Sequence, residues 1–157
     1  MPADPERIGV SPYLVPLSVL HVTGPERAAA EHLAGVHRVH GWDVAVARSA
    51  PRSPEHAVVV LHGLGIARLR ARLRGSATTV VLAGADRPAG PVGLLVERVL
   101  AQWTNAVVVS GDAAAEWWAH RVPVPVTRLR PGAPDPDEIA AILVRAAAWG
   151  RPAAQRT

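Results

Sequence analysis

The chain has 157 residues, enough for one domain with a sizeable buried core. Its 17 basic residues are all arginine and give a formal net charge of only +4, too small an excess to indicate a nucleic-acid partner. It has no cysteine, which excludes disulfides, thiolate nucleophiles and cysteine-bound metals, and no apolar run reaches the roughly 20 residues of a membrane span, so we expect a cytoplasmic protein.

Residues 1–16 are a proline-broken extension without the basic start or continuous apolar segment of a signal peptide. Short segments rich in Val and Leu then alternate with helix-like segments, a pattern typical of βαβ units on a parallel sheet. Strands are predicted at Leu17–Val22, Asp43–Ala47, Ala57–Leu61, Thr78–Leu82 and Ala106–Ser110, with a short sixth at Val126–Leu129.

The first helix is expected between the first two strands. Thr23 and Glu26 have the spacing of a capping box, so the helix is predicted to begin there. Leu33, Val36 and Val39 are expected to face the sheet.

Further helices are predicted at Leu64–Arg74, at Val92–Trp103 and after Ser110. The last of these carries Trp117 and Trp118, which point about 100° apart on a helix and cannot share one narrow buried stripe. These two tryptophans either form a surface that binds a partner or pack against the last helix.

The final helix has the clearest start signal. Asp135 has the N-cap position, Pro136 the first helical position, and Glu138 follows three residues after the cap. Apolar residues from Ile139 to Ala147 recur at helical spacing, so one face is expected to dock on the core.

These elements predict a single Rossmann-like three-layer α/β domain over residues 17–150, with a closing helix at 135–149 and a tail at 151–157. The link Ser49–His56 is short for a crossover, so it either crosses the sheet without a full helix or brings the third strand in differently. With strand order 2-1-3-4-5, ligands bind where the winding reverses, beyond the carboxyl ends of strands one and three. His21 and His62 are expected there.

Several segments resemble, in their order and spacing, the N-terminal domain of GT-B glycosyltransferases, in particular the retaining family 4 type. The matching segments are Ser18–Thr23, Glu31–Ala34, His40–Val46, Val60–Gly63, Ala106–Ser110 and Val124–Gly132. Two departures bear on function. The glycine-rich loop after the first strand is shortened to Gly24-Pro25, and Ala85-Asp86 stands where the family has His-Asp.

The resemblance implies a site that binds a glycosyl acceptor. It makes His62 a candidate for hydrogen bonding or proton transfer, and His21, Gly24, Gly63 and Asp86 candidate acceptor-binding residues. The alternatives are strand-end histidines bonded to nearby backbone and a turn-forming Asp86. Because no tight histidine spacing, GxGxxG fingerprint or Walker loop is present, neither a metal nor a cofactor is expected.

The densest charge run lies within the helix predicted at Leu64–Arg74. Arg68, Arg70, Arg72 and Arg74 would form a cationic ridge on it. This ridge is either an ordinary solvated face or a peripheral contact with anionic lipid on the inner face of a membrane.

The resemblance extends from Leu17 to Asp135 and does not include the family's C-terminal donor domain. It therefore implies an acceptor-side half that is not active alone and needs a donor-binding domain in trans. The candidate partners are a glycosyltransferase subunit that carries such a domain, or further copies of this chain in a homo-oligomer. Two alternatives stay open: a non-catalytic remnant that serves as an interaction module, and an unrelated Rossmann-like small-molecule binder.

Overall fold

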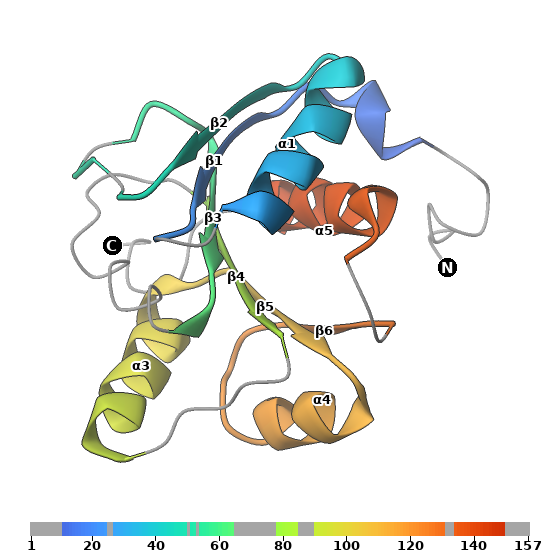
Figure 1. The fold of residues 1–157 in the computed structure, drawn as a ribbon. Coiled ribbons are helices and arrows are strands. Elements are labelled where there is room, and N and C mark those ends of the chain that lie inside the picture. The colour runs from blue at the N-terminus through green and yellow to red at the C-terminus, as the bar shows by residue number, and fades with distance from the viewer. Residues whose placement is uncertain are drawn as a thin grey trace.

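A computed structural model describes residues 11–24, 27–49, 51–52, 54–64, 78–84, 90–130 and 134–149. Within these described residues, six strands and four α-helices form one α/β unit (Figure 1). The strands are β1 (Ser18–Val22), β2 (Asp43–Ala47), β3 (Val58–His62), β4 (Thr78–Gly84), β5 (Ala106–Ser110) and β6 (Val126–Leu129). The helices are the 3-10 turn η1 (Pro12–Leu14) and the α-helices α1 (Ala28–Val39), α3 (Gly90–Trp103), α4 (Asp112–Ala119) and α5 (Pro136–Trp149).

The sheet is parallel throughout, with strand order β2-β1-β3-β4-β5-β6. This confirms the predicted fold class and the predicted reversal between β1 and β3. β3 pairs with β1 in parallel, and the described residues between β2 and β3 form no helix, so the short link crosses the sheet without one. The result is a Rossmann-like parallel α/β domain.

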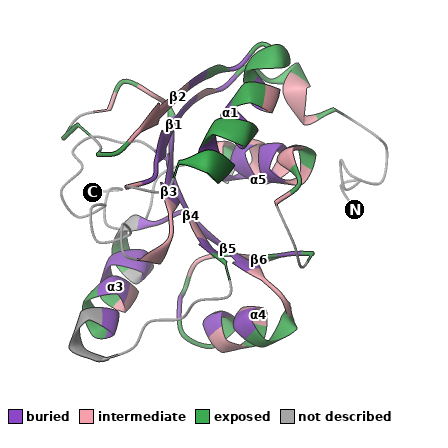
Figure 2. Cartoon of the chain, in the orientation of Figure 1, coloured by how far each residue is buried: buried purple, intermediate pink, exposed green. Residues whose placement is uncertain are grey.

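Helices cover both faces of the sheet (Figures 1 and 2). On one face, Leu33 of α1 and Ile139 of α5 pack with Val60 and Val80 of the sheet. On the other, Leu100 of α3 and Trp118 of α4 pack in a second apolar cluster with strand residues. Because both faces of the central strands are buried, these strands carry continuous Val and Leu rather than alternating polar residues.

The start of α1 corrects the predicted capping box. The helix begins at Ala28 with Arg27 at its N-cap, and the Thr23 hydroxyl instead donates to the Gly24 carbonyl (3.0 Å). Gly24 has φ +64°, so the chain turns in the left-handed region before the helix can begin. The capping-box interpretation is therefore wrong.

The buried stripe of α1 also differs from the expected one. Leu33 is buried, Val36 is half-buried, and Val39 is 85% exposed. His37, four residues after Leu33, is fully buried instead and hydrogen-bonds the Pro136 carbonyl through Nε2 (2.9 Å). An i, i+4 step keeps His37 on the face of Leu33, whereas Val39 at the last turn has rotated away.

η1 contacts both the start of α5 and the end of α1 through the side chain of Tyr13. The Tyr13 hydroxyl donates to Asp137 Oδ1 (2.7 Å), and its ring stacks on His40 with centroids 3.8 Å apart. Burial, together with the adjacent Asp137 carboxylate, raises the pKa of Tyr13. Tyr13 therefore holds η1 against the end of α1 and the start of α5.

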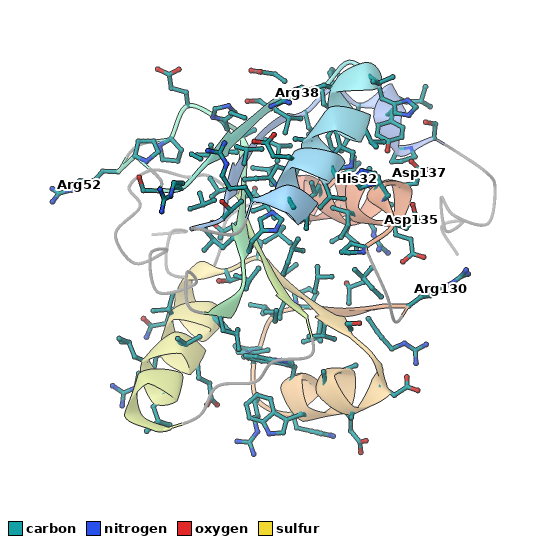
Figure 3. The ribbon with its side chains drawn as sticks, viewed as in Figure 1. His32, Arg38, Arg52, Arg130, Asp135 and Asp137 are labelled. Carbon is teal, nitrogen blue, oxygen red and sulfur yellow. The ribbon has the colours of Figure 1, made fainter. Side chains whose placement is uncertain are left out.

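The start of α5 is as predicted. Asp135 accepts a hydrogen bond from the Asp137 amide (3.0 Å), and the Ile139 amide bonds the Asp135 carbonyl (3.0 Å); Asp135 and Asp137 are labelled in Figure 3. The inward face of α5 is buried, as expected, at Ile139, Ile142, Leu143 and Ala146.

Replacing the N-cap Asp135→Ala is expected to lower the free energy of unfolding by about 1 kcal/mol, because a helix-start amide loses its acceptor. Urea unfolding measures the change. Glu116→Ala, which removes an exposed acid from α4, is the control and should change stability by less than about 0.5 kcal/mol. Equal costs for the two variants would contradict the capping role.

Candidate functional site

A cavity of about 340 Å³ opens at the carboxyl ends of β3, β4 and β5. Its other walls come from the first turns of α1 and from the residue that leads into α5. Its lining residues are Ala29, Leu33, His62, Leu82, Gly84, Val108, Val109, Ser110, Leu129 and Pro134. The cavity is thus at the sheet edge where parallel α/β domains hold their ligands, beside the reversal of the strand order.

His62 is the ionisable side chain among these lining residues, and it is paired with His21. His21 lies opposite Val60 in the β1–β3 register, and Val60 comes two residues before His62. The side chains of His21 and His62 therefore emerge on the same face of neighbouring strands. His21 Nδ1 and His62 Nε2 are 2.7 Å apart. The sequence placed both residues at this edge, and the structure brings them into direct contact.

Both histidines are uncharged at neutral pH. Burial lowers the pKa of His21 to about 3, and the neighbouring His62 adds to this shift. Burial also lowers the pKa of His62 to about 4. His21 is fully buried, and its Nε2 has no hydrogen-bond partner among the described residues.

The two glycines predicted for the site have backbone roles. Gly63 has φ +94°, a conformation that favours glycine, and its amide donates to the Leu82 carbonyl (2.9 Å). Gly24 forms the turn after β1 with φ +64°. Neither is among the described residues that line the cavity, so they shape the strand ends beside it.

Ser110 is a lining residue that sequence reasoning missed. It ends β5 and is half-buried at the cavity, where its hydroxyl adds a polar group across from His62. The sequence does contain a feature that could have identified Ser110: it is the polar residue at the end of a Val-rich strand. The same feature identified His62 at the end of β3.

Other predicted site residues fall outside the described part of the chain. Asp86 lies there, as do the four arginines of the predicted cationic ridge, Arg68, Arg70, Arg72 and Arg74; of the helix predicted at Leu64–Arg74, only Leu64 is described. Within the described residues, no three His, Cys, Asp or Glu side chains group into a metal site. None of the helices described is long and apolar enough to cross a membrane.

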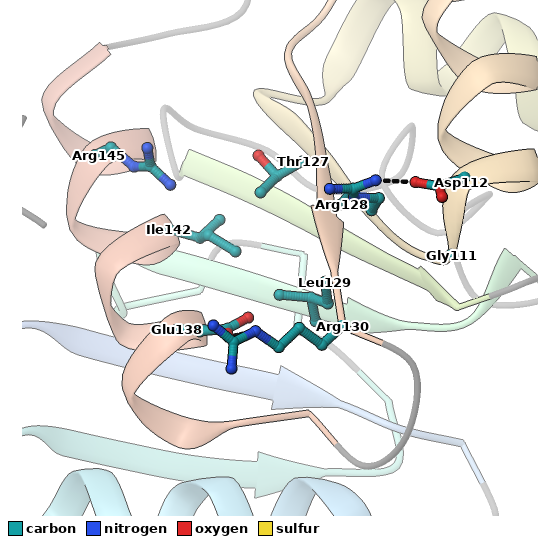
Figure 4. A pocket seen from close by; sticks show the side chains of 9 residues that line it. All are labelled: Gly111, Asp112, Thr127, Arg128, Leu129, Arg130, Glu138, Ile142 and Arg145. Carbon is teal, nitrogen blue, oxygen red and sulfur yellow. Dashed lines mark hydrogen bonds and ion pairs between the residues drawn. The ribbon is translucent and has the colours of Figure 1, made fainter.

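A larger groove of about 760 Å³ lies between β6 and α5 (Figure 4). Two of its arginines face carboxylates: Arg128 is ion-paired with Asp112, and Arg130 lies 3.8 Å from Glu138. Because Arg128 and Arg130 are paired with carboxylates and the groove lies away from the strand-order reversal between β1 and β3, we take the His62 cavity at the carboxyl edge as the candidate site despite its smaller volume. Sequence reasoning did not anticipate the groove, which depends on how α5 returns beside β6.

The geometry defines a small cavity with apolar walls, a serine hydroxyl and an uncharged histidine pair. Such a site can hydrogen-bond an uncharged polar group. Comparison of the chain with protein-family models, with curated proteins and with solved structures finds no match, so what is established is a Rossmann-like parallel α/β domain with this cavity at its carboxyl edge.

Proposed function

We propose that this domain binds a small hydroxyl-bearing molecule, a glycosyl acceptor, in the carboxyl-edge cavity, with His62 as its main polar contact. The observation that supports this most is the uncharged His21–His62 pair at a ligand-sized cavity beside the strand-order reversal. The resemblance of the strand and turn segments to the acceptor-side domain of GT-B glycosyltransferases supports the same proposal.

The walls of the cavity suit the two kinds of surface that a sugar presents. Leu33, Leu82 and Val108 offer apolar contact for ring C–H groups. Ser110 and His62 offer hydrogen bonds for hydroxyl groups. An uncharged imidazole forms these bonds without the desolvation cost that a buried cation would carry.

The low pKa of His62 bears on its part in the reaction. A group with a pKa of about 4 is a weak general base at pH 7, because the best bases titrate near the working pH. We therefore assign His62 to binding and orienting the acceptor hydroxyl. Glycosyl transfer would further need a donor-binding domain supplied by a partner subunit.

Two other functions fit the same cavity and are decided by experiment. A Rossmann-like binder of nucleotides or flavins would fill it with a different ligand class. A non-catalytic interaction module would leave it empty, a reading favoured by the shortened loop at Gly24-Pro25 and by Ala85. Contact of the arginine ridge with an anionic membrane stays a prediction.

Saturation-transfer NMR with a panel of simple sugars and methyl glycosides, alongside NAD and FMN, tests the proposal. His62→Ala is expected to weaken glycoside binding about tenfold, the effect of one lost hydrogen bond. His32→Ala, on the exposed side of α1, is the matched control and should leave binding unchanged. Binding of the nucleotides alone would favour the Rossmann-like binder, and binding of nothing would favour the interaction module.

If a glycoside binds, its transfer can be assayed with a nucleotide-sugar donor and a donor-binding domain added separately. We expect no turnover by this domain alone, and turnover that falls with His62→Ala when the two are combined. Turnover by this domain alone, or turnover that does not depend on His62, would contradict the proposal that this domain binds the acceptor through His62 while a separate domain binds the donor.

A further inference from the structure

The contact between His21 and His62 limits which tautomers the two rings can adopt. A neutral imidazole has one N–H and one bare nitrogen, so a hydrogen bond between two neutral rings admits only two arrangements. Either His21 donates from Nδ1 and His62 accepts at Nε2, or His62 donates from Nε2 and His21 accepts at Nδ1. The 2.7 Å separation between these two nitrogens requires one or the other.

The arrangements differ at His21 Nε2, which is buried without a partner among the described residues. If His62 is the donor, His21 carries its own hydrogen on Nε2, and a buried N–H is left without an acceptor. If His21 is the donor, Nε2 is a bare nitrogen instead. Among backbone groups, orphaned buried N–H groups are rarer than under-satisfied carbonyl acceptors. Applied to the ring nitrogens, the same preference favours the arrangement in which His21 donates.

We propose that His21 is a positioning residue that holds His62 in the tautomer with its hydrogen on Nδ1. His62 Nε2 is then occupied by His21, and the ring nitrogen left for a ligand is an N–H donor. Resting on the proposed function, this identifies the ligand atom that meets His62 as a hydrogen-bond acceptor: a hydroxyl, ether or carbonyl oxygen of an uncharged acceptor molecule.

Other groups near the pair do not change this assignment. His37 and Arg38 are the charged or titratable neighbours that act on His21, and both disfavour a positive charge on it. His37 uses its own Nε2 for the Pro136 carbonyl. The pair therefore stays neutral as a unit over the pH range in which the tautomer is measured.

Long-range 1H–15N NMR on the free protein at pH 7.5 distinguishes the tautomers, because a protonated ring nitrogen and a bare one resonate in separate regions. We expect His62 to show a protonated Nδ1 and a bare Nε2, with its signals assigned by their loss in His62→Gln. The Asn amide lies close to where Nδ1 of histidine lies, so His21→Asn should keep this tautomer. His21→Leu, which has no donor, should shift His62 toward the Nε2–H form.

A wild-type His62 with its hydrogen on Nε2 overturns the assignment, and so does a folded His21→Leu that keeps the wild-type tautomer. If His21→Leu does not fold, as judged by its amide spectrum, the wild-type and His21→Asn spectra decide by themselves. The measurement needs no ligand, so its outcome is separate from that of the glycoside panel: failure of glycoside binding would refute the proposed function, whereas the tautomer of His62 tests the role of His21.

Discussion

Trp118→Ala should lower the free energy of unfolding by about 3 to 5 kcal/mol, whereas Trp117→Ala should lower it by about 1 to 2 kcal/mol. The two residues are neighbours on α4, yet their surroundings differ. Trp118 is fully buried against the sheet and belongs to a cluster with Val107 and Val122. Trp117 is half-buried, meets Trp118 edge to face, and has the Arg121 guanidinium 4.3 Å from its ring centroid.

The difference follows from the space each ring leaves. Removing Trp118 opens a large cavity in the core, and the surrounding sheet relaxes only partly. Removing Trp117 loses only the partial burial of its ring and a cation–π contact worth about 0.5 to 1 kcal/mol. Urea unfolding at pH 7.5 measures both, with Trp118→Phe as a milder variant should Trp118→Ala fail to fold. Equal costs for the two alanine variants would contradict the observed packing of α4.

Acid should destabilise the domain steeply through the histidine pair. The unfolded pKa of a histidine is about 6.5, whereas burial holds His21 near 3 and His62 near 4. Because the folded-state pKa values lie below the unfolded ones, protons favour the unfolded chain. The stabilisation is fully present above pH 6.5 and is lost as pH falls toward 4. We expect the free energy of unfolding to fall by roughly 3 to 4 kcal/mol between pH 7.5 and pH 5 from these two residues.

Matched variants separate this effect from general acid sensitivity. His62→Gln keeps an amide at the site but does not titrate, so about half of the pH dependence due to the pair should disappear. His32→Gln, in which an exposed histidine of α1 is replaced, is the control for removing a histidine outside the pair. His37 is also buried with a lowered pKa and adds to the slope in every variant. A free energy of unfolding that stays constant from pH 7.5 to pH 5 would show that the pair is not buried and neutral.

Much of the fold follows from local sequence. Asp43–Ala47, Ala106–Ser110 and Val126–Leu129 form strands with the predicted bounds, since short runs of branched residues bounded by turns have few alternatives in an α/β domain. The last helix begins where its N-cap residue predicts. Strand order was accessible as well, because crossover rules leave few arrangements for alternating strands and helices.

The errors arise where tertiary structure overrides local signals. Thr23 and Glu26 have the capping-box spacing, but the chain first turns through the left-handed Gly24 and the helix starts later. Val39 lies at the expected spacing from Val36, yet the last turn of α1 presents His37 to the core instead. Helix periodicity gives an apolar face, but the packing partner decides which edge of it is buried.

The candidate site was predictable only in part. The switch-point rule places His21 and His62 at one edge of the sheet. Their direct contact depends on the β1–β3 register, which aligns His21 with Val60, and no sequence pattern gives that register. Ser110 was placed correctly at the end of β5 but not recognised as a cavity residue, because its relation to His62 spans the intervening strand β4.

The most direct test of the central claim, that the cavity beside His62 is the ligand site, is amide chemical-shift mapping with the methyl glycoside that shows the strongest saturation transfer. We predict that the shifts concentrate at the carboxyl edge, at His62, Gly84 and Ser110, and become smaller in His62→Ala at the same glycoside concentration, because its affinity is about tenfold weaker. Shifts confined to the groove between β6 and α5, at Thr127 and Arg128, would contradict the claim, and so would shifts that persist unchanged in His62→Ala.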